Sequence, residues 1–161
     1  MVSRTTRQSQ EPATIGLADR NRSRKVPRTA RLLKHADFER VYQQGHRHFG
    51  RLLTAFFLRR ELGESPGDKR GEKRSPAREM RGARVGFTVG PGLGGSVERN
   101  RIKRRMREAV RLHRGQLMAS VDVVFNPKKA VLKADFSEVG REVARAFQAI
   151  TSNSARKQGA K

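Results

Sequence analysis

The apolar residues of this 161-residue chain are concentrated in two stretches, 31–58 and 84–150. The segments outside them are rich in charged and polar residues and in Gly and Pro, and they contain few large apolar side chains. Segments of this composition bury too little apolar surface to offset the entropy lost on ordering. We therefore predict one folded domain with flexible attachments. These are a disordered basic tail at 1–30, the domain at 31–150, a flexible charged insertion at 59–83 within it, and a short disordered tail at 151–161.

The periodicity of apolar residues predicts both helices and strands within the domain. Helices are expected at 36–44, ended by Gly45; at 97–113, capped by Ser96; and at 136–150, with Asp135 and Glu138 as a capping box. Strands are expected at 51–58, 84–89 and 121–125. The last helix is expected to bury one stripe of side chains, namely Val139, Val143, Phe147 and Ile150. Interleaved helices and strands indicate the α+β class, a small mixed sheet with packed helices.

The charge of the chain points to a polyanionic partner. Lys and Arg number 37 against 15 Asp and Glu, a formal net charge of +22. The two apolar stretches hold 19 of these cations and 8 of the acids, so the excess is not confined to the tails. A charge of this size opposes compaction unless a partner neutralises it, and nucleic acid is the leading candidate. No apolar run approaches the ~18 residues that cross a bilayer. The first ten residues also lack the apolar stretch of a signal peptide, so we expect a cytoplasmic protein without a membrane partner.

Several catalytic and metal-binding classes are disfavoured. The chain has no cysteine, which excludes a disulfide scaffold, a zinc ribbon and a thiol nucleophile. Carboxylates are scattered, so a two-metal nuclease site is not expected. His46 and His48 share a face if their segment is extended, but without a third ligand they are expected to be surface histidines. Gly90–Gly95 fits the G-x-G-x-x-G pattern, yet the acid of a dinucleotide fold is missing and the following helix is too cationic. We interpret this loop as a turn.

The helix expected at 97–113 has two chemically different faces. At about 100° per residue, its apolar face gathers Ile102, Met106, Ala109, Val110 and His113. The opposite face is cationic and polar, and it comprises Asn100, Arg104, Arg107 and Arg111, with Lys103 on its shoulder and Arg99 at the N-terminal edge. Only Glu98 and Glu108 could balance these charges, and neither is expected in the cationic row. Because guanidinium groups suit phosphate oxygens, this face predicts a contact with nucleic acid.

Aromatic side chains supply a second candidate surface. Phe38 and Tyr42 lie one turn apart on the first predicted helix, and Phe56 and Phe57 project to opposite faces of the first predicted strand. Core packing accounts for most phenylalanines. If helices cover only one face of the sheet, Tyr42 and one of the two strand phenylalanines would form a stacking platform for unpaired bases on the other.

The run Gly95–Glu108 (GSVERNRIKRRMRE), with its Arg-Asn-Arg core followed by Ile-Lys-Arg, resembles the signature of the bacterial ribonuclease P protein component. Arg31–Lys34 followed by Asp37–Gly45 is similar to the first helix of that family, and Asp122–Pro127 to its last strand and turn. The resemblance implies an α-β sandwich of the ribosomal-protein-domain type with a left-handed βαβ crossover. One departure is Pro91-Gly92, which stands where family members commonly carry a lysine pair.

The resemblance also implies a function. A protein of this family assists a catalytic ribonuclease P RNA in removing the 5′ leader from precursor tRNA, by binding both RNAs and lowering the magnesium requirement. Catalysis and magnesium then belong to the RNA, and the protein holds no cofactor, no metal and no small-molecule substrate. The residues implied are Arg99, Asn100, Lys103, Arg104, Arg107 and Arg111 on the ribozyme-facing helix, and Phe38, Tyr42 and Phe56 in a leader-binding cleft. The alternatives are a ribosomal or other structural RNA-binding protein of the same fold, which would need no cleft, and a nuclease acting alone.

Overall fold

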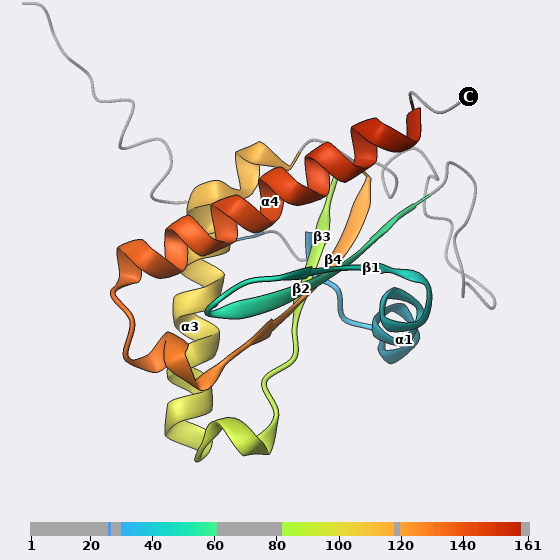
Figure 1. The fold of residues 1–161 in the computed structure, drawn as a ribbon. Helices are drawn as coiled ribbons and strands as arrows, with labels where there is room; N and C mark the ends of the chain where they lie inside the picture. Colours follow the sequence, from blue (N-terminus) through green and yellow to red (C-terminus); the bar gives the residue numbers. More distant parts are fainter. Residues whose placement is uncertain (1–25, 27–29, 61–81, 118–119, 159–161) are drawn as a thin grey trace, which may run out of the picture.

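The computed structural model describes residues 26, 30–60, 82–117 and 120–158, with side chains described as far as residue 153 (Figure 1). Among these residues, three consecutive strands separate the first helix from the second, and one further strand and one further helix follow. In order they are α1 (His35–Gln44), β1 (His46–Phe49), β2 (Leu53–Arg59), β3 (Arg84–Phe87), α3 (Ser96–His113), β4 (Val121–Pro127) and α4 (Phe136–Gln158). Three short 3-10 turns, η2 (Pro91–Leu93), η3 (Arg114–Gln116) and η4 (Lys129–Leu132), connect them.

The four strands form one mixed sheet in the order β1-β2-β4-β3. β2 pairs antiparallel with β1 on one side and with β4 on the other, where Ala55 lies opposite Phe125. β3 and β4 are parallel neighbours, with Val85 opposite Val123, and α3 connects them. The predicted α+β class is confirmed, and the βαβ unit that the resemblance implies is present.

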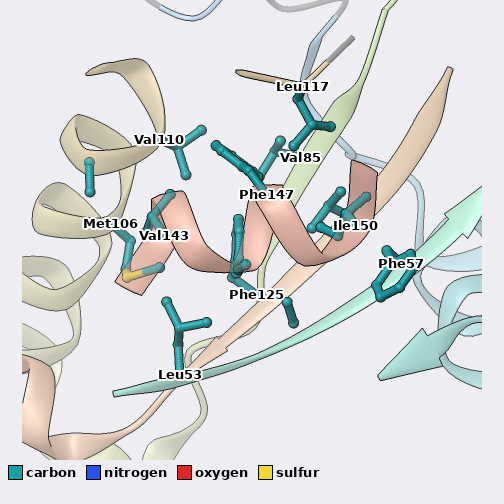
Figure 2. Packing of buried hydrophobic residues seen from close by; sticks show 14 of the residues in the cluster. Leu53, Phe57, Val85, Met106, Val110, Leu117, Phe125, Val143, Phe147 and Ile150 are labelled. Carbon is teal, nitrogen blue, oxygen red and sulfur yellow. The ribbon is translucent and has the colours of Figure 1, made fainter. Parts of the chain in front are cut away.

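The larger core lies between one face of the sheet and the two long helices, α3 and α4 (Figures 1 and 2). Near its centre the rings of Phe125 and Phe147 lie 5.8 Å apart, centroid to centroid. The stripe predicted for the last helix is buried at every position, as are Ile102, Met106, Ala109 and Val110 of α3. His113 is only half-buried, and its ring lies against Gly140, where a Cβ would come within 3.1 Å of Nε2. The absence of a side chain at Gly140 therefore lets the two helices approach.

The opposite face of the sheet is not free, contrary to the sequence-based expectation. Helix α1 lies on this face, and Val41 packs with Leu32 and Val124 in a second, smaller core (Figure 1). Strand alternation separates the two cores, because Phe57 enters the larger one and Phe56 borders the smaller one. The prediction that these two rings point to opposite faces is confirmed.

Several element boundaries differ from those predicted. Strand β1 was not predicted, because HRHF has no apolar alternation and its strand conformation depends on pairing with β2. The strand predicted at 51–58 begins at Leu53, and the one predicted at 84–89 ends at Phe87. The last helix, predicted to end at 150, continues to Gln158, so most of the tail expected at 151–161 is helical. Its polar sequence lacks an apolar stripe, but extending an existing helix needs no new nucleus.

The N-cap of α3 also differs from the prediction, because it is Gly95 and not Ser96. The Gly95 carbonyl accepts the Arg99 amide at 3.0 Å, and Glu98 Oε2 accepts the Gly95 amide at 2.9 Å. Gly94 just before it has φ of 125°, a conformation that favours glycine. The glycine loop is thus a turn into α3, as interpreted from the sequence.

The predicted insertion is narrower than 59–83. Residues 61–81 lie outside the described part of the chain, but both flanks are packed. The Arg60 amide donates to Ser120 O at 2.9 Å, its guanidinium donates to Gly82 O, and Ala83 is buried. Most of the segment predicted as the N-terminal tail, 1–30, also lies outside the described residues, but its last residue, Ala30, is buried. The packed chain therefore extends a few residues into both of the segments that composition predicts to be flexible.

We expect that replacing residues 61–81 with a short Gly-Ser linker leaves the free energy of unfolding within about 1 kcal/mol of the parent, because loop-closure entropy changes slowly with length. Thermal and urea unfolding of the full chain measure this. Deleting 59–83 is the matched comparison, and it should destabilise strongly because it also removes Arg60 and Ala83. A cooperative loss of folding with the shorter deletion would show that 61–81 holds a packed element.

Candidate RNA interface

Helix α1 is joined to the sheet by a buried ion cluster centred on Asp122 of β4. The Asp122 side chain is fully buried, and Arg84 binds it with two hydrogen bonds, Nε to Oδ1 at 2.8 Å and Nη2 to Oδ2 at 2.6 Å. Arg84 Nη1 also donates to Asp37 Oδ2 of α1 at 3.1 Å. Arg40 of α1 reaches Asp122 Oδ2 at 3.2 Å, and Arg60 Nε lies 3.1 Å from Oδ1. The cluster thus connects α1, β3, β4 and the end of β2.

The cluster contains three guanidinium groups and two carboxylates, all largely buried. Burial lowers the pKa of Arg60, and the negative charge of Asp122 offsets only part of that shift. Burial also acts to lower the pKa of Arg84, but hydrogen bonds and charge interactions with Asp122 and Asp37 outweigh it and raise that pKa. This cluster was not predicted from the sequence. Its only signal was one carboxylate inside the apolar strand VDVVF, at a position facing away from the larger core.

The structure brings together the three aromatic residues assigned to a cleft, Phe38, Tyr42 and Phe56. The Tyr42 and Phe56 rings meet edge to face, with centroids 4.8 Å apart. The Phe38 ring lies over Gly86 of β3, where a Cβ would come within 2.6 Å of Cζ. All three side chains are half-buried at the border of the smaller core. They form one aromatic surface between α1 and the sheet.

Polar groups of the sheet orient Tyr42 in this surface. Its hydroxyl donates to Asn126 Oδ1 at 2.7 Å and shares a 2.8 Å hydrogen bond with the Thr88 hydroxyl. Tyr42 therefore has a fixed ring position, a satisfied hydroxyl and a partly exposed face. This combination can stack an unpaired base without first ordering the side chain.

The cationic face of α3 is present, with one correction. Asn100, Arg104 and Arg107 are exposed, and Arg99 and Lys103 are half-buried. Arg111 instead pairs with Glu108 one turn back, with Nη2 2.6 Å and Nε 2.9 Å from its carboxylate oxygens. The expectation that no acid lies in the cationic row is therefore wrong at this end. These hydrogen bonds lower the pKa of Glu108, and the i, i+3 spacing was the available signal.

A neighbouring arginine of the same run has a structural role. The Arg105 guanidinium donates to the carbonyl oxygens of Val131, Leu132 and Ala134, which satisfies the backbone of η4 and the turn into α4. Arg104 and Arg105 are adjacent in sequence, but about 100° of helix rotation sends one to the exterior and the other to the protein backbone.

Neither a metal centre nor a membrane span is found in the part of the chain that the structure describes. No group of three or more His, Cys, Asp or Glu within it is arranged to hold an ion. No helix among the same residues has the length and apolar character to cross a membrane. His46 and His48 do share a face of β1, as predicted. The centroid of the His46 ring lies 5.7 Å from that of the Phe57 ring.

The fold and this surface define a small basic α+β protein with a cationic helix and an aromatic surface on different faces of one sheet. The sequence profile of the family described as Ribonuclease P matches residues 26–151. The ribonuclease P protein component of Brucella melitensis is 37% identical over 132 residues, covering 81% of this chain and 84% of that protein. The ribonuclease P protein component of Alkaliphilus metalliredigens is 30% identical over 109 residues, covering 68% of this chain and 82% of that protein. The chain therefore belongs to the ribonuclease P protein family and is an RNA-processing subunit.

Solved structures agree on the fold. The RNase P protein of Staphylococcus aureus superposes with a TM-score of 0.57 at 22% identity, covering 75% of this chain and 94% of that one. The RNase P protein from Thermotoga maritima superposes with a TM-score of 0.57 at 23% identity, covering 74% of this chain and 96% of that one.

We expect Asp122→Asn to lower the free energy of unfolding by about 3–5 kcal/mol, because it leaves buried guanidinium groups without their counter-charge. Urea unfolding of the full chain measures this loss. Glu39→Gln, at an exposed carboxylate of α1 outside the cluster, is the control and should change the value by less than about 0.5 kcal/mol. Equal effects of the two substitutions would mean that the cluster does not hold α1 in place.

Proposed function

We propose that this chain is the protein subunit of a cytoplasmic ribonuclease P, in which a catalytic RNA removes the 5′ leader from precursor tRNA. The protein binds the catalytic RNA through the exposed face of α3 and holds the single-stranded leader between α1 and the sheet. The observation that carries the proposal is the convergence of Phe38, Tyr42 and Phe56 on one half-exposed surface, in a chain of this family. A structural RNA-binding protein would not need such a surface.

The charge pattern of α3 supports the contact with the catalytic RNA. Within the described residues, no carboxylate lies within ion-pair distance of Arg104 or Arg107, which are both exposed. Like charges on neighbouring turns repel one another until an anion binds between them. The phosphates of a folded RNA supply that anion, and their neutralisation by protein reduces the need for magnesium.

The carboxylates of the described residues are largely committed to structure, which supports catalysis by the RNA. Asp37 and Asp122 belong to the ion cluster. Glu98 accepts the Gly95 amide at the start of α3, and Glu108 binds Arg111. The buried Glu142 of α4 accepts the Leu52 amide. None of these carboxylates lies free in the aromatic surface to act as a general base.

The direct test combines the full chain with a transcribed ribonuclease P RNA and a precursor tRNA. We expect no cleavage by protein alone and strong stimulation of the RNA at low magnesium. Magnesium-dependent cleavage by RNA-free protein would establish a nuclease acting alone. Tight RNA binding without stimulation would indicate a structural RNA-binding protein instead.

Changing Arg104 and Arg107 together to Ala should weaken binding to the catalytic RNA. The slope of log K against log salt should also shrink by about one for each lost phosphate contact. A filter-binding series at several salt concentrations measures both quantities. Changing Arg141 and Arg145 together to Ala, two exposed arginines of α4, is the charge-matched control and should leave the slope nearly unchanged. If this double change has the same effect as the α3 change, binding depends on net charge and not on this helix face.

Tyr42→Ala should weaken precursor tRNA binding by the assembled complex by ~1–3 kcal/mol, the contribution of one stacked base, and leave mature tRNA binding unchanged. Because Tyr42 is half-buried, Tyr42→Phe is needed as a second variant. It keeps the ring and removes the hydrogen bonds to Asn126 and Thr88, so it should lose much less leader affinity than Tyr42→Ala. An equal loss for mature and precursor tRNA would place Tyr42 in the core and not in a leader site.

A further inference from the structure

Two side chains of the edge strand β1, Arg47 and Phe49, extend the aromatic surface beyond the three residues of the cleft. In the β1–β2 register, Arg47 lies opposite Phe56 and Phe49 opposite Thr54. Directly opposed residues of a strand pair project to the same face, so both side chains point to the α1 side of the sheet. The Arg47 Cζ atom lies 5.6 Å from the Phe56 ring centroid and 6.0 Å from that of Phe49. A continuous row thus leads from Tyr42 through Phe56 and Arg47 to Phe49.

Phe49 is 70% exposed, at the end of the edge strand β1. The turn that follows it is fixed from two sides. Lys128 Nζ donates to Gly50 O at 2.8 Å, and the Gly50 amide donates to Leu53 O at 2.9 Å. The buried Glu142 of α4 packs so closely on Gly50 that a Cβ there would lie 2.1 Å from Oε1. These contacts fix the backbone next to Phe49, and its ring extends from there into solvent.

We propose that Arg47 and Phe49 form an additional nucleotide site, continuous with the cleft, which takes one unpaired RNA nucleotide. The base stacks on the exposed Phe49 ring, and the Arg47 guanidinium, which lies near both the Phe49 and Phe56 rings, binds the adjoining phosphate. This inference rests on the proposed function, because it extends the leader-binding surface to the edge of the sheet.

The chemistry of this edge favours RNA over a protein partner. Arg47 is exposed, and no carboxylate of the described residues forms an ion pair with it, so the site presents an unneutralised cation beside an aromatic face. On β2, Thr54 lies opposite Phe49 of β1 on one side and opposite Asn126 of β4 on the other. The Phe49 ring therefore borders polar side chains and not an apolar groove. An exposed aromatic ring, a neighbouring guanidinium and polar side chains together match one nucleotide.

The test is an abasic scan of the leader, with one nucleotide at a time lacking its base, measured as precursor tRNA affinity of the complete protein–RNA complex. With the wild-type protein, removing the base at one leader position should weaken binding about fivefold. With Phe49→Ala, removing the same base should cause no further loss. A different leader position should couple to Tyr42→Ala in the same way. Phe136→Ala, a partly exposed phenylalanine of α4, is the matched control and should couple to no position.

Arg47 is tested by its salt dependence in the same complex. Arg47→Ala should reduce the salt slope by about 0.7, the value for one single-strand phosphate, whereas Arg47→Lys should keep the slope. Thermal unfolding of each variant should match the parent because both side chains are exposed.

The outcomes separate this inference from the proposed function. If Tyr42 couples to a leader position and Phe49 couples to none, the additional site is wrong and the cleft stands. If neither residue couples to any leader position, the proposed function itself fails. If both couple to the same position, Phe49 belongs to the cleft and is not an additional site.

Discussion

The position of the aromatic surface depends on the buried ion pairs of Asp122. Helix α1 has ten residues and buries one apolar side chain completely, Val41, so its packing alone gives it little hold on the sheet. Arg84 bridges Asp37 of α1 to Asp122, and Arg40 of α1 binds the same carboxylate. Because the aromatic surface lies between α1 and the sheet, its shape depends on this cluster. Without the Asp122 carboxylate, the guanidinium groups of Arg40, Arg60 and Arg84 would repel one another between α1 and the sheet.

Arginine is used in three ways in this chain, and position decides which. Arg84 is enclosed by carboxylates and connects elements. Arg105 donates to backbone carbonyls and fixes a turn. Arg104 and Arg107 extend into solvent on the far side of α3 and remain available to phosphates. A net charge of +22 therefore overstates the charge that RNA can contact, because part of it holds the fold together.

Sequence periodicity predicted the elements that local residues determine. The buried face of α3, the stripe of α4 and the opposed rings of Phe56 and Phe57 follow from repeats of 3.6 and 2 residues. Strand β1 and the Asp122 cluster could not be predicted in this way, because both arise from residues distant in sequence. The Glu108–Arg111 pair was within reach of the i, i+3 rule. The grouping of Phe38, Tyr42 and Phe56 came from family resemblance, since periodicity alone does not show that α1 lies over β2.

In the proposed function, two RNA-binding surfaces lie on different faces of one small sheet. Photo-cross-linking of the complete complex, followed by mass spectrometry of the protein, distinguishes the two surfaces. With a photoreactive base in the precursor tRNA leader, we predict cross-links to Tyr42, Phe56 and Phe49, and none within 96–113. With photoreactive bases in the catalytic RNA, we predict the reverse distribution, centred on Arg104 and Arg107. Leader cross-links concentrated on α3, with α1 and β1 unlabelled, would show that the leader does not bind the aromatic surface.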